Sequence, residues 1–167
     1  MPNPPIPPER LDNFDYENDP RGERCPFGSH TRRAFPRTDF IAGGKGAAFR
    51  RRIIRRGMPY GPPYDRVNPD DVERGLLGLF ICASLEEQFE FILSEWINRG
   101  SFTGTLDIAS RDPLLGANAP ADSQMQIPMP QEPRIELHGF ERFVTTRGGA
   151  YVFLPSLPAL RFIGSLG

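Results

Sequence analysis

Residues 75–98, GLLGLFICASLEEQFEFILSEWIN, decide the fold. The first part, 75–82, is a continuous apolar run whose length and flanks favour a strand buried on both faces. Ser84 is a good N-cap, and Glu87 three positions later completes a capping box. A helix is predicted over 84–98, because apolar residues recur at helical spacing before a stop at Gly100: Leu85, Phe89, Ile92, Leu93 and Trp96.

The rest of the chain is rich in turns, since 19 prolines and 17 glycines occur among its 167 residues. A few short elements are nevertheless expected to assemble with the strand and helix above into an α+β domain with a mainly antiparallel sheet. In chain order the predictions are a short helix or tight turn (25–37), a loop (38–52), a short strand at Ile53-Ile54, a turn (55–65), a long loop (101–139), two short strands around Gly148-Gly149 and a last helical turn (159–162).

Composition excludes some classes of protein. The chain carries 20 basic and 21 acidic residues, so its charge demands neither nucleic acid nor an anionic membrane as partner. No run of about 18 apolar residues is present to span a bilayer. Residues 1–24 predict a proline-rich extended arm without the apolar region of a signal peptide, which favours a cytoplasmic location, and 25–167 predict one module. The two cysteines provide no disulfide framework.

One of the two histidines lies in a segment suited to binding haem. His30 ends the stretch CPFGSH and is closely followed by Arg32, Arg33 and Arg37. Imidazole is the usual protein ligand of peroxidase iron, and guanidinium groups suit the two haem propionates. The alternative is a surface histidine in a basic turn. Other candidate ligands are Cys25, which precedes a proline, and His138, which lies beside a strand candidate.

Four blocks in order resemble the C-terminal half of dye-decolorizing (DyP-type) haem peroxidases. The blocks are CPFGSHTRRAFPR (25–37), RRRIIRRGMPYGPP (50–63), ERGLLGLFICASLEEQFEFILSEWIN (73–98) and RFVTTRGGAYVFLPSLPALRF (142–162). The resemblance covers nearly the whole chain. It implies the second of two ferredoxin-like α+β modules, the one that binds most of the haem.

The resemblance also implies roles for individual residues. His30 matches the proximal ligand of the haem iron, and Arg55 matches the distal arginine. The implied cofactor is haem b, and the implied reaction oxidises bulky aromatic or dye-like reductants with hydrogen peroxide. Two features depart from the family. Phe35-Pro36-Arg37 stands where Asn-Pro-Arg is usual, so phenylalanine replaces the asparagine. The sequence also contains no GxxDG motif, whose aspartate lies in the N-terminal half of the family's proteins.

Alternatives remain open beside a complete peroxidase. The chain could be a catalytically incomplete fragment or split-gene half that needs an N-terminal partner, and a homo-oligomer is left open. Arg55 could belong to a solvated basic cluster, because residues 30–56 contain nine Lys or Arg and one acid. A nucleic-acid binder built on Arg50–Arg56 is disfavoured, since no recognised motif accompanies the slightly acidic composition.

The last prediction concerns the carboxylate behind His30. A histidine is a stronger donor to iron when its other ring nitrogen gives its proton to a carboxylate. The 84–98 helix carries four acids and no basic residue, and at about 100° per residue Glu86 falls on the flank of the apolar stripe. Glu86 is the predicted acceptor and Glu90, one turn along, the substitute. The alternative is that Glu86 favours the helix N-terminus through the dipole.

Overall fold

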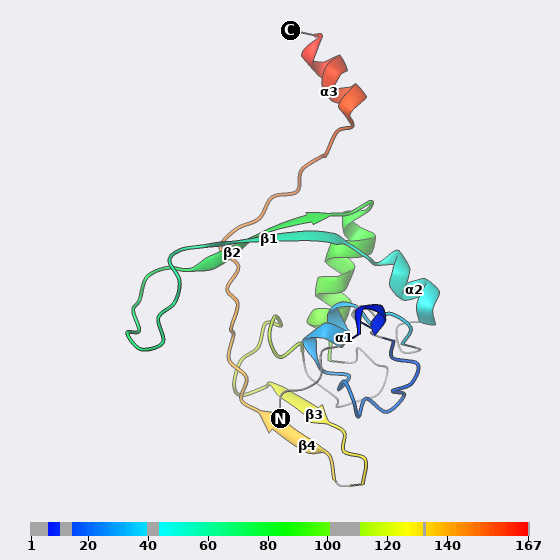
Figure 1. Cartoon of the computed structure of the whole chain (residues 1–167), viewed down its shortest axis with the longest axis vertical. Helices are drawn as coiled ribbons and strands as arrows, with labels where there is room; N and C mark the ends of the chain where they lie inside the picture. The colour runs from blue at the N-terminus through cyan, green and yellow to red at the C-terminus, as the bar shows by residue number, and fades with distance from the viewer. Residues whose placement is uncertain (1–6, 11–14, 40–43, 101–110, 132, 167) are drawn as a thin grey trace.

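The computed structural model describes residues 7–10, 15–39, 44–100, 111–131 and 133–166. Its strands form two antiparallel pairs (Figure 1). In one, β1 (Ile54–Tyr60) pairs with β2 (Gly75–Ile81); in the other, β3 (Gln124–Ile127) pairs with β4 (Ile135–His138). The predicted α+β class with antiparallel strands is confirmed, although in the described residues the strands form two separate small sheets.

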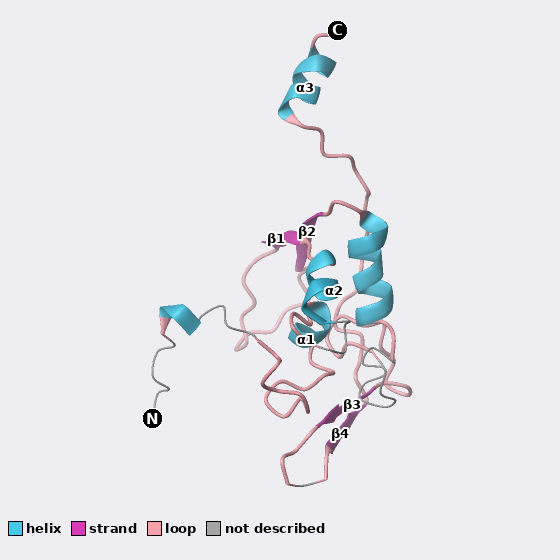
Figure 2. Ribbon diagram, turned by 90° about the vertical axis from the view of Figure 1, so that its right-hand side faces the viewer, coloured by secondary structure: helices cyan, strands magenta, loops and turns pink. Residues whose placement is uncertain are grey.

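A small core lies where three helical segments meet (Figure 2). Ile92, Trp96 and Ile97 from one segment pack with Ala48 of another, and Ala34 packs against them. Burying a side chain such as Ile92 or Ile97 contributes roughly 1.5–3 kcal/mol. The helices are η1 (Pro8–Arg10), α1 (His30–Ala34), α2 (Gly44–Arg50), the consecutive η3 (Leu85–Glu90) and η4 (Ile92–Ile97), and α3 (Leu157–Gly164). None of those in the described ranges is long and apolar enough to cross a bilayer.

The predicted helix over 84–98 is present, but its turns are wider than those of an α-helix. In η3 and η4 the backbone bonds five residues back, as from Asn98 N–H to Leu93 O. The Ser84 hydroxyl accepts from Glu87 N–H at 3.2 Å, which confirms the cap. Gln88 instead of Glu87 accepts from Ser84 N–H, at 3.0 Å. The wider turn accounts for this shift of one residue in the capping box.

The strand β2 is present as predicted, but its predicted burial is wrong. Leu76 and Leu77 leave 67% and 60% of their surface exposed. β2 pairs only with β1 within the described residues, so the apolar run has no second layer against it. The hairpin touches the helical body mainly at one end, where the rings of Phe80 and Phe89 lie 5.2 Å apart.

Several loop and strand boundaries differ from the predictions. The expected loop 38–52 contains α2. β1 continues to Tyr60, into the expected turn 55–65, because it pairs along its length with β2. The expected loop 101–139 contains β3 and β4. Residues 139–156 form no strands: they run as an extended segment past the β1–β2 hairpin, and α3 projects beyond it (Figure 1). Extended segments become strands only when they pair with a neighbouring strand. In the described residues this segment pairs with none, and its first residue, Gly139, donates a single backbone bond to Ser123 O at 3.2 Å.

Candidate functional site

The site begins at His30, the first residue of α1. Ser29 precedes it in extended conformation as the N-cap, and Ser29 N–H is bonded to Pro26 O at 2.9 Å. The turn therefore presents His30 at the start of a short helix. Its Nδ1 lies 2.9 Å from Oδ2 of Asp112, while 40% of the imidazole side chain stays exposed.

Asp112 is fully buried and tightly held. Its Oδ1 accepts from Leu114 N–H at 2.9 Å and Leu115 N–H at 2.8 Å. Its own N–H donates to Ile97 O at 2.7 Å, at the end of η4. These bonds fix the carboxylate, so that its second oxygen faces His30.

The two groups shift each other's pKa in the directions expected for an ion pair. The hydrogen bond to Asp112 raises the pKa of His30; burial and the positive charge of Arg55 act against it. Burial alone would raise the pKa of Asp112. The hydrogen bonds from His30 and the backbone outweigh burial, so the pKa of Asp112 is lowered. The pair is therefore ionised more readily than two isolated side chains would be.

Asp112, and not Glu86, is the carboxylate that contacts His30. Glu86 lies exposed in the first turn of η3, whereas His30 and Asp112 lie near the C-terminal end of η4. Glu86 was predicted from helical periodicity, and the residue that contacts His30 lies outside the periodic helix. Asp112 is in a stretch without periodicity, RDPLLG, whose one local signal is an aspartate that precedes a proline and bonds the backbone two residues on.

Arg32 is taken up by ion pairs within the protein, which does not fit the predicted contact with a propionate. Its side chain is fully buried, with Nε bonded to Asp39 at 2.6 Å and Nη1 to Asp19 at 2.9 Å. The guanidinium carbon lies over the rings of Tyr16, at 4.6 Å, and Phe27, at 4.1 Å. Arg32 therefore anchors part of the arm predicted for residues 1–24 against α1, because that arm supplies Asp19 and Tyr16.

The other predicted side chains lie in different places. Arg55 is exposed on β1, opposite Phe80, and its charge acts on His30. Arg37 is half-buried, with its guanidinium carbon 5.0 Å from the Phe35 ring centre. The roles predicted for both remain predictions. His138 is exposed on β4, 3.6 Å from Glu136.

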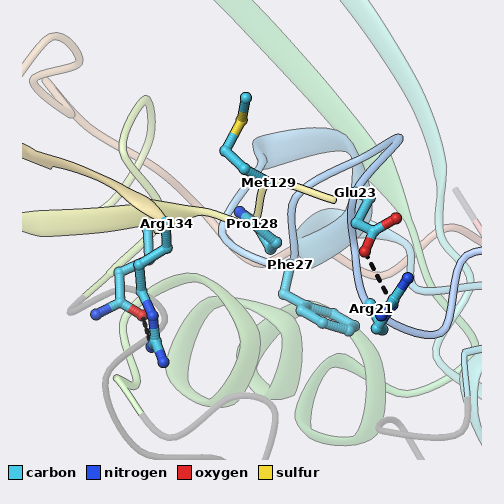
Figure 3. Close-up of a pocket in the computed structure, with 7 residues that line it drawn as sticks. Arg21, Glu23, Phe27, Pro128, Met129 and Arg134 are labelled. Atoms are coloured by element: carbon cyan, nitrogen blue, oxygen red, sulfur yellow. Dashed lines mark hydrogen bonds and ion pairs between the residues drawn. The ribbon is translucent and has the colours of Figure 1, made fainter. Parts of the chain in front are cut away.

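A shallow pocket of about 320 Å³ lies elsewhere (Figure 3). Phe27 and Met129 contribute apolar surface, and Arg21 pairs across 2.8 Å with Glu23 at the rim. Gln126 accepts from Arg134 at 2.5 Å. His30 is not among the lining residues, so the pocket is separate from the His30–Asp112 pair.

Comparison with known proteins agrees with the resemblance. No protein-family model matches the chain. A dye-decolorizing peroxidase from Mycetinis scorodonius is 31% identical over 95% of the chain and 33% of its own length. The solved DyP2 of Amycolatopsis sp. aligns with a TM-score of 0.69 at 27% identity, over 87% of this chain and 34% of that one. A dye-decolorizing peroxidase solved in complex with 2,6-dimethoxyphenol aligns at 0.66 and 26% identity, over 83% and 31%.

The chain therefore spans about a third of the length of the relatives that it matches. Sequence and fold agree on the same group of proteins, and both matches cover most of the chain. By both criteria this chain is a relative of the dye-decolorizing peroxidases and corresponds to one part of them.

Proposed function

We propose that this chain is the haem-binding part of a peroxidase, in which Nε2 of His30 would bind the iron. One observation carries the proposal: Nδ1 of His30 is engaged by a buried carboxylate, and Nε2 makes no hydrogen bond to any described residue. Histidines that bind metals typically give their other N–H to a carboxylate, which fixes the ring and makes it a stronger donor. The residues present therefore fit an iron porphyrin, and haem b is the proposed form.

When bound, haem would supply the iron that reacts with hydrogen peroxide. Asp112 would keep the proton on Nδ1, so that the lone pair of Nε2 remains free for the metal. Arg55 is proposed to stabilise negative charge as the peroxide O–O bond separates, since a guanidinium stays protonated and cannot act as the base. Arg55 lies within electrostatic range of His30, since its positive charge acts to lower the pKa of the imidazole. Arg37 is proposed to contact a propionate.

We further propose that full activity requires the rest of the peroxidase, which would supply the acid for proton transfer. The chain spans about a third of its relatives and has no GxxDG sequence. Apolar side chains are exposed on both the hairpin and the C-terminal segment, which supports the proposal that the rest of the peroxidase packs against them as a second layer. They are Leu76, Leu77 and Leu79 on β2, Val152, Phe153 and Leu154 in the extended segment, and Leu157, Phe162 and Ile163 on α3.

Reconstitution with haemin tests the ligand. The chain should give the spectrum of a histidine-bound ferric haem, His30→Ala should abolish it, and His138→Ala should leave it unchanged. An unchanged Soret band in His30→Ala would contradict the assignment.

A complementation experiment tests the need for a partner. The isolated chain should oxidise 2,6-dimethoxyphenol poorly with peroxide. Adding the remaining two-thirds of the Mycetinis scorodonius relative should raise turnover by orders of magnitude. Full activity of the isolated chain would refute the requirement.

A further inference from the structure

Arg33 is buried one turn beyond His30 on α1, yet its guanidinium contacts a different part of the chain. Only 1% of the residue is exposed. Nε donates to Trp96 O at 2.6 Å and Nη2 to Arg99 O at 2.6 Å, with Ile97 O at 3.5 Å. These carbonyls end the η4 helix, where no further turn of helix supplies N–H donors.

The same helix end also holds Asp112. Ile97 O accepts from Asp112 N–H at 2.7 Å, and Oδ2 of Asp112 lies 2.9 Å from His30 Nδ1. The connections therefore form a closed ring: from His30 to Asp112, to the end of η4, to Arg33, and through α1 back to His30.

We propose that Arg33 is a positioning residue that keeps Asp112 in register with the imidazole of His30 by clamping the carbonyl end of η4. The role rests on the proposed function, since it serves the iron ligand. An arginine suits it because its planar fork donates to separate carbonyls from two nitrogens held at a fixed spacing, whereas the donors of an ammonium group all lie on one nitrogen.

The cost of burying the cation supports a role beyond filling space. Burial lowers the pKa of Arg33 to about 10, and the negative charge of Asp112 acts in the opposite direction. An apolar side chain of similar volume would pack without this cost. The guanidinium is instead held by carbonyl dipoles and lies within electrostatic range of the carboxylate that contacts His30.

The test measures the imidazole itself, in the full chain without haem. Only two histidines occur, so ¹⁵N-histidine spectra resolve His30 with His138 as internal reference. At alkaline pH, where the rings are neutral, the wild type should carry the His30 proton on Nδ1. Arg33→Met and Arg33→Lys should each lower the population of this tautomer by at least about half, because the hydrogen bond that selects it is weakened.

Arg51→Met is the matched control, because Arg51 also donates to a helix carbonyl, Glu87 O at 2.6 Å, but in η3, the element that precedes η4 and lies away from its carbonyl end. It should leave the tautomer unchanged. After loading with haemin and reduction, the iron–histidine stretching band should move to lower frequency in the Arg33 variants alone.

The possible results separate the two proposals. Folded Arg33 variants with the wild-type tautomer, or a wild type without the Nδ1–H form, would overturn the positioning role even if haemin binds. Arg33→Lys keeps charge and stem, so its failure to fold would assign Arg33 a purely structural role. If His30→Ala leaves the haemin spectrum unchanged, the proposed function fails, while the tautomer result still decides the positioning of Asp112.

Discussion

Replacing Asp112 by asparagine would invert the polarity of the contact with His30 at almost constant volume. Oδ1 already accepts from the N–H groups of Leu114 and Leu115, so the amide oxygen of the variant can take that place. The amide nitrogen then occupies the position 2.9 Å from Nδ1 of His30. Because this nitrogen only donates, Nδ1 must accept, and the ring proton moves to Nε2. That is the atom proposed to bind iron.

The expected effect is a 10- to 100-fold loss of haemin affinity, the usual range for losing a group that supports a metal ligand, or roughly 1.4–2.7 kcal/mol. Titration of the full chain with haemin, followed at the Soret band, measures it, and ¹⁵N spectra without haemin report the tautomer. Asp122→Asn is the matched control, since Asp122 is largely exposed and pairs with Arg111 at 3.3 Å. It should change neither measurement.

Two results would refute the reasoning in different ways. An inverted tautomer with unchanged haemin affinity would show that Nε2 of His30 is not the ligand. An unchanged tautomer would show that the contact between His30 and Asp112 does not select the proton position.

Two further predictions follow from the buried charges. Arg32→Met should lower the free energy of unfolding by about 3–5 kcal/mol in urea denaturation, because Asp19 and Asp39 lose their buried partner; a loss under about 1 kcal/mol would contradict that pairing. The folded pKa is raised for His30 and lowered for Asp112, so their mutual stabilisation should be complete between about pH 4 and 6.5. It should decline above this window as His30 deprotonates and below it as Asp112 is protonated. Thermal melts of wild type and Asp112→Asn should therefore differ most there, and a difference that grew above about pH 8 would exclude this coupling.

The parts of the fold that the sequence predicted are those with a local signal. Ser84 caps a helix because its hydroxyl can reach an unbonded N–H. At the C-terminal end only a turn over 159–162 was predicted, and the structure extends it to α3, whose start is capped by the Ser156 hydroxyl accepting from Ala159 N–H. β2 was recognised from its apolar run. Its burial was not predictable, because burial depends on which layer covers the strand, and the apolar run alone does not say whether this chain contains that layer.

The candidate site was only half predictable for the same reason. His30 stands out as one of two histidines within a block shared with a known family, but Asp112 lies 82 residues away in a segment without periodicity. Arg32 and Arg33 are neighbours with identical chemistry, and nothing local distinguishes the anchor of residues 15–25 from the clamp on η4. Their different roles follow from their partners in the folded chain. Arg32 pairs with Asp19 and Asp39, whereas Arg33 donates to the carbonyls of Trp96 and Arg99.

The two residues proposed to act on haem differ in how far this chain builds their surroundings. His30, the proposed iron ligand, belongs with Asp112 and the end of η4 to one hydrogen-bonded unit with a buried carboxylate. Arg55, the residue proposed to stabilise charge, lies exposed on a two-stranded sheet that no second layer covers in the described residues. Water at such a surface screens charge and competes for the metal. On the proposed function, iron ligation should therefore be a property of this chain, while efficient peroxide cleavage should depend on what covers Arg55.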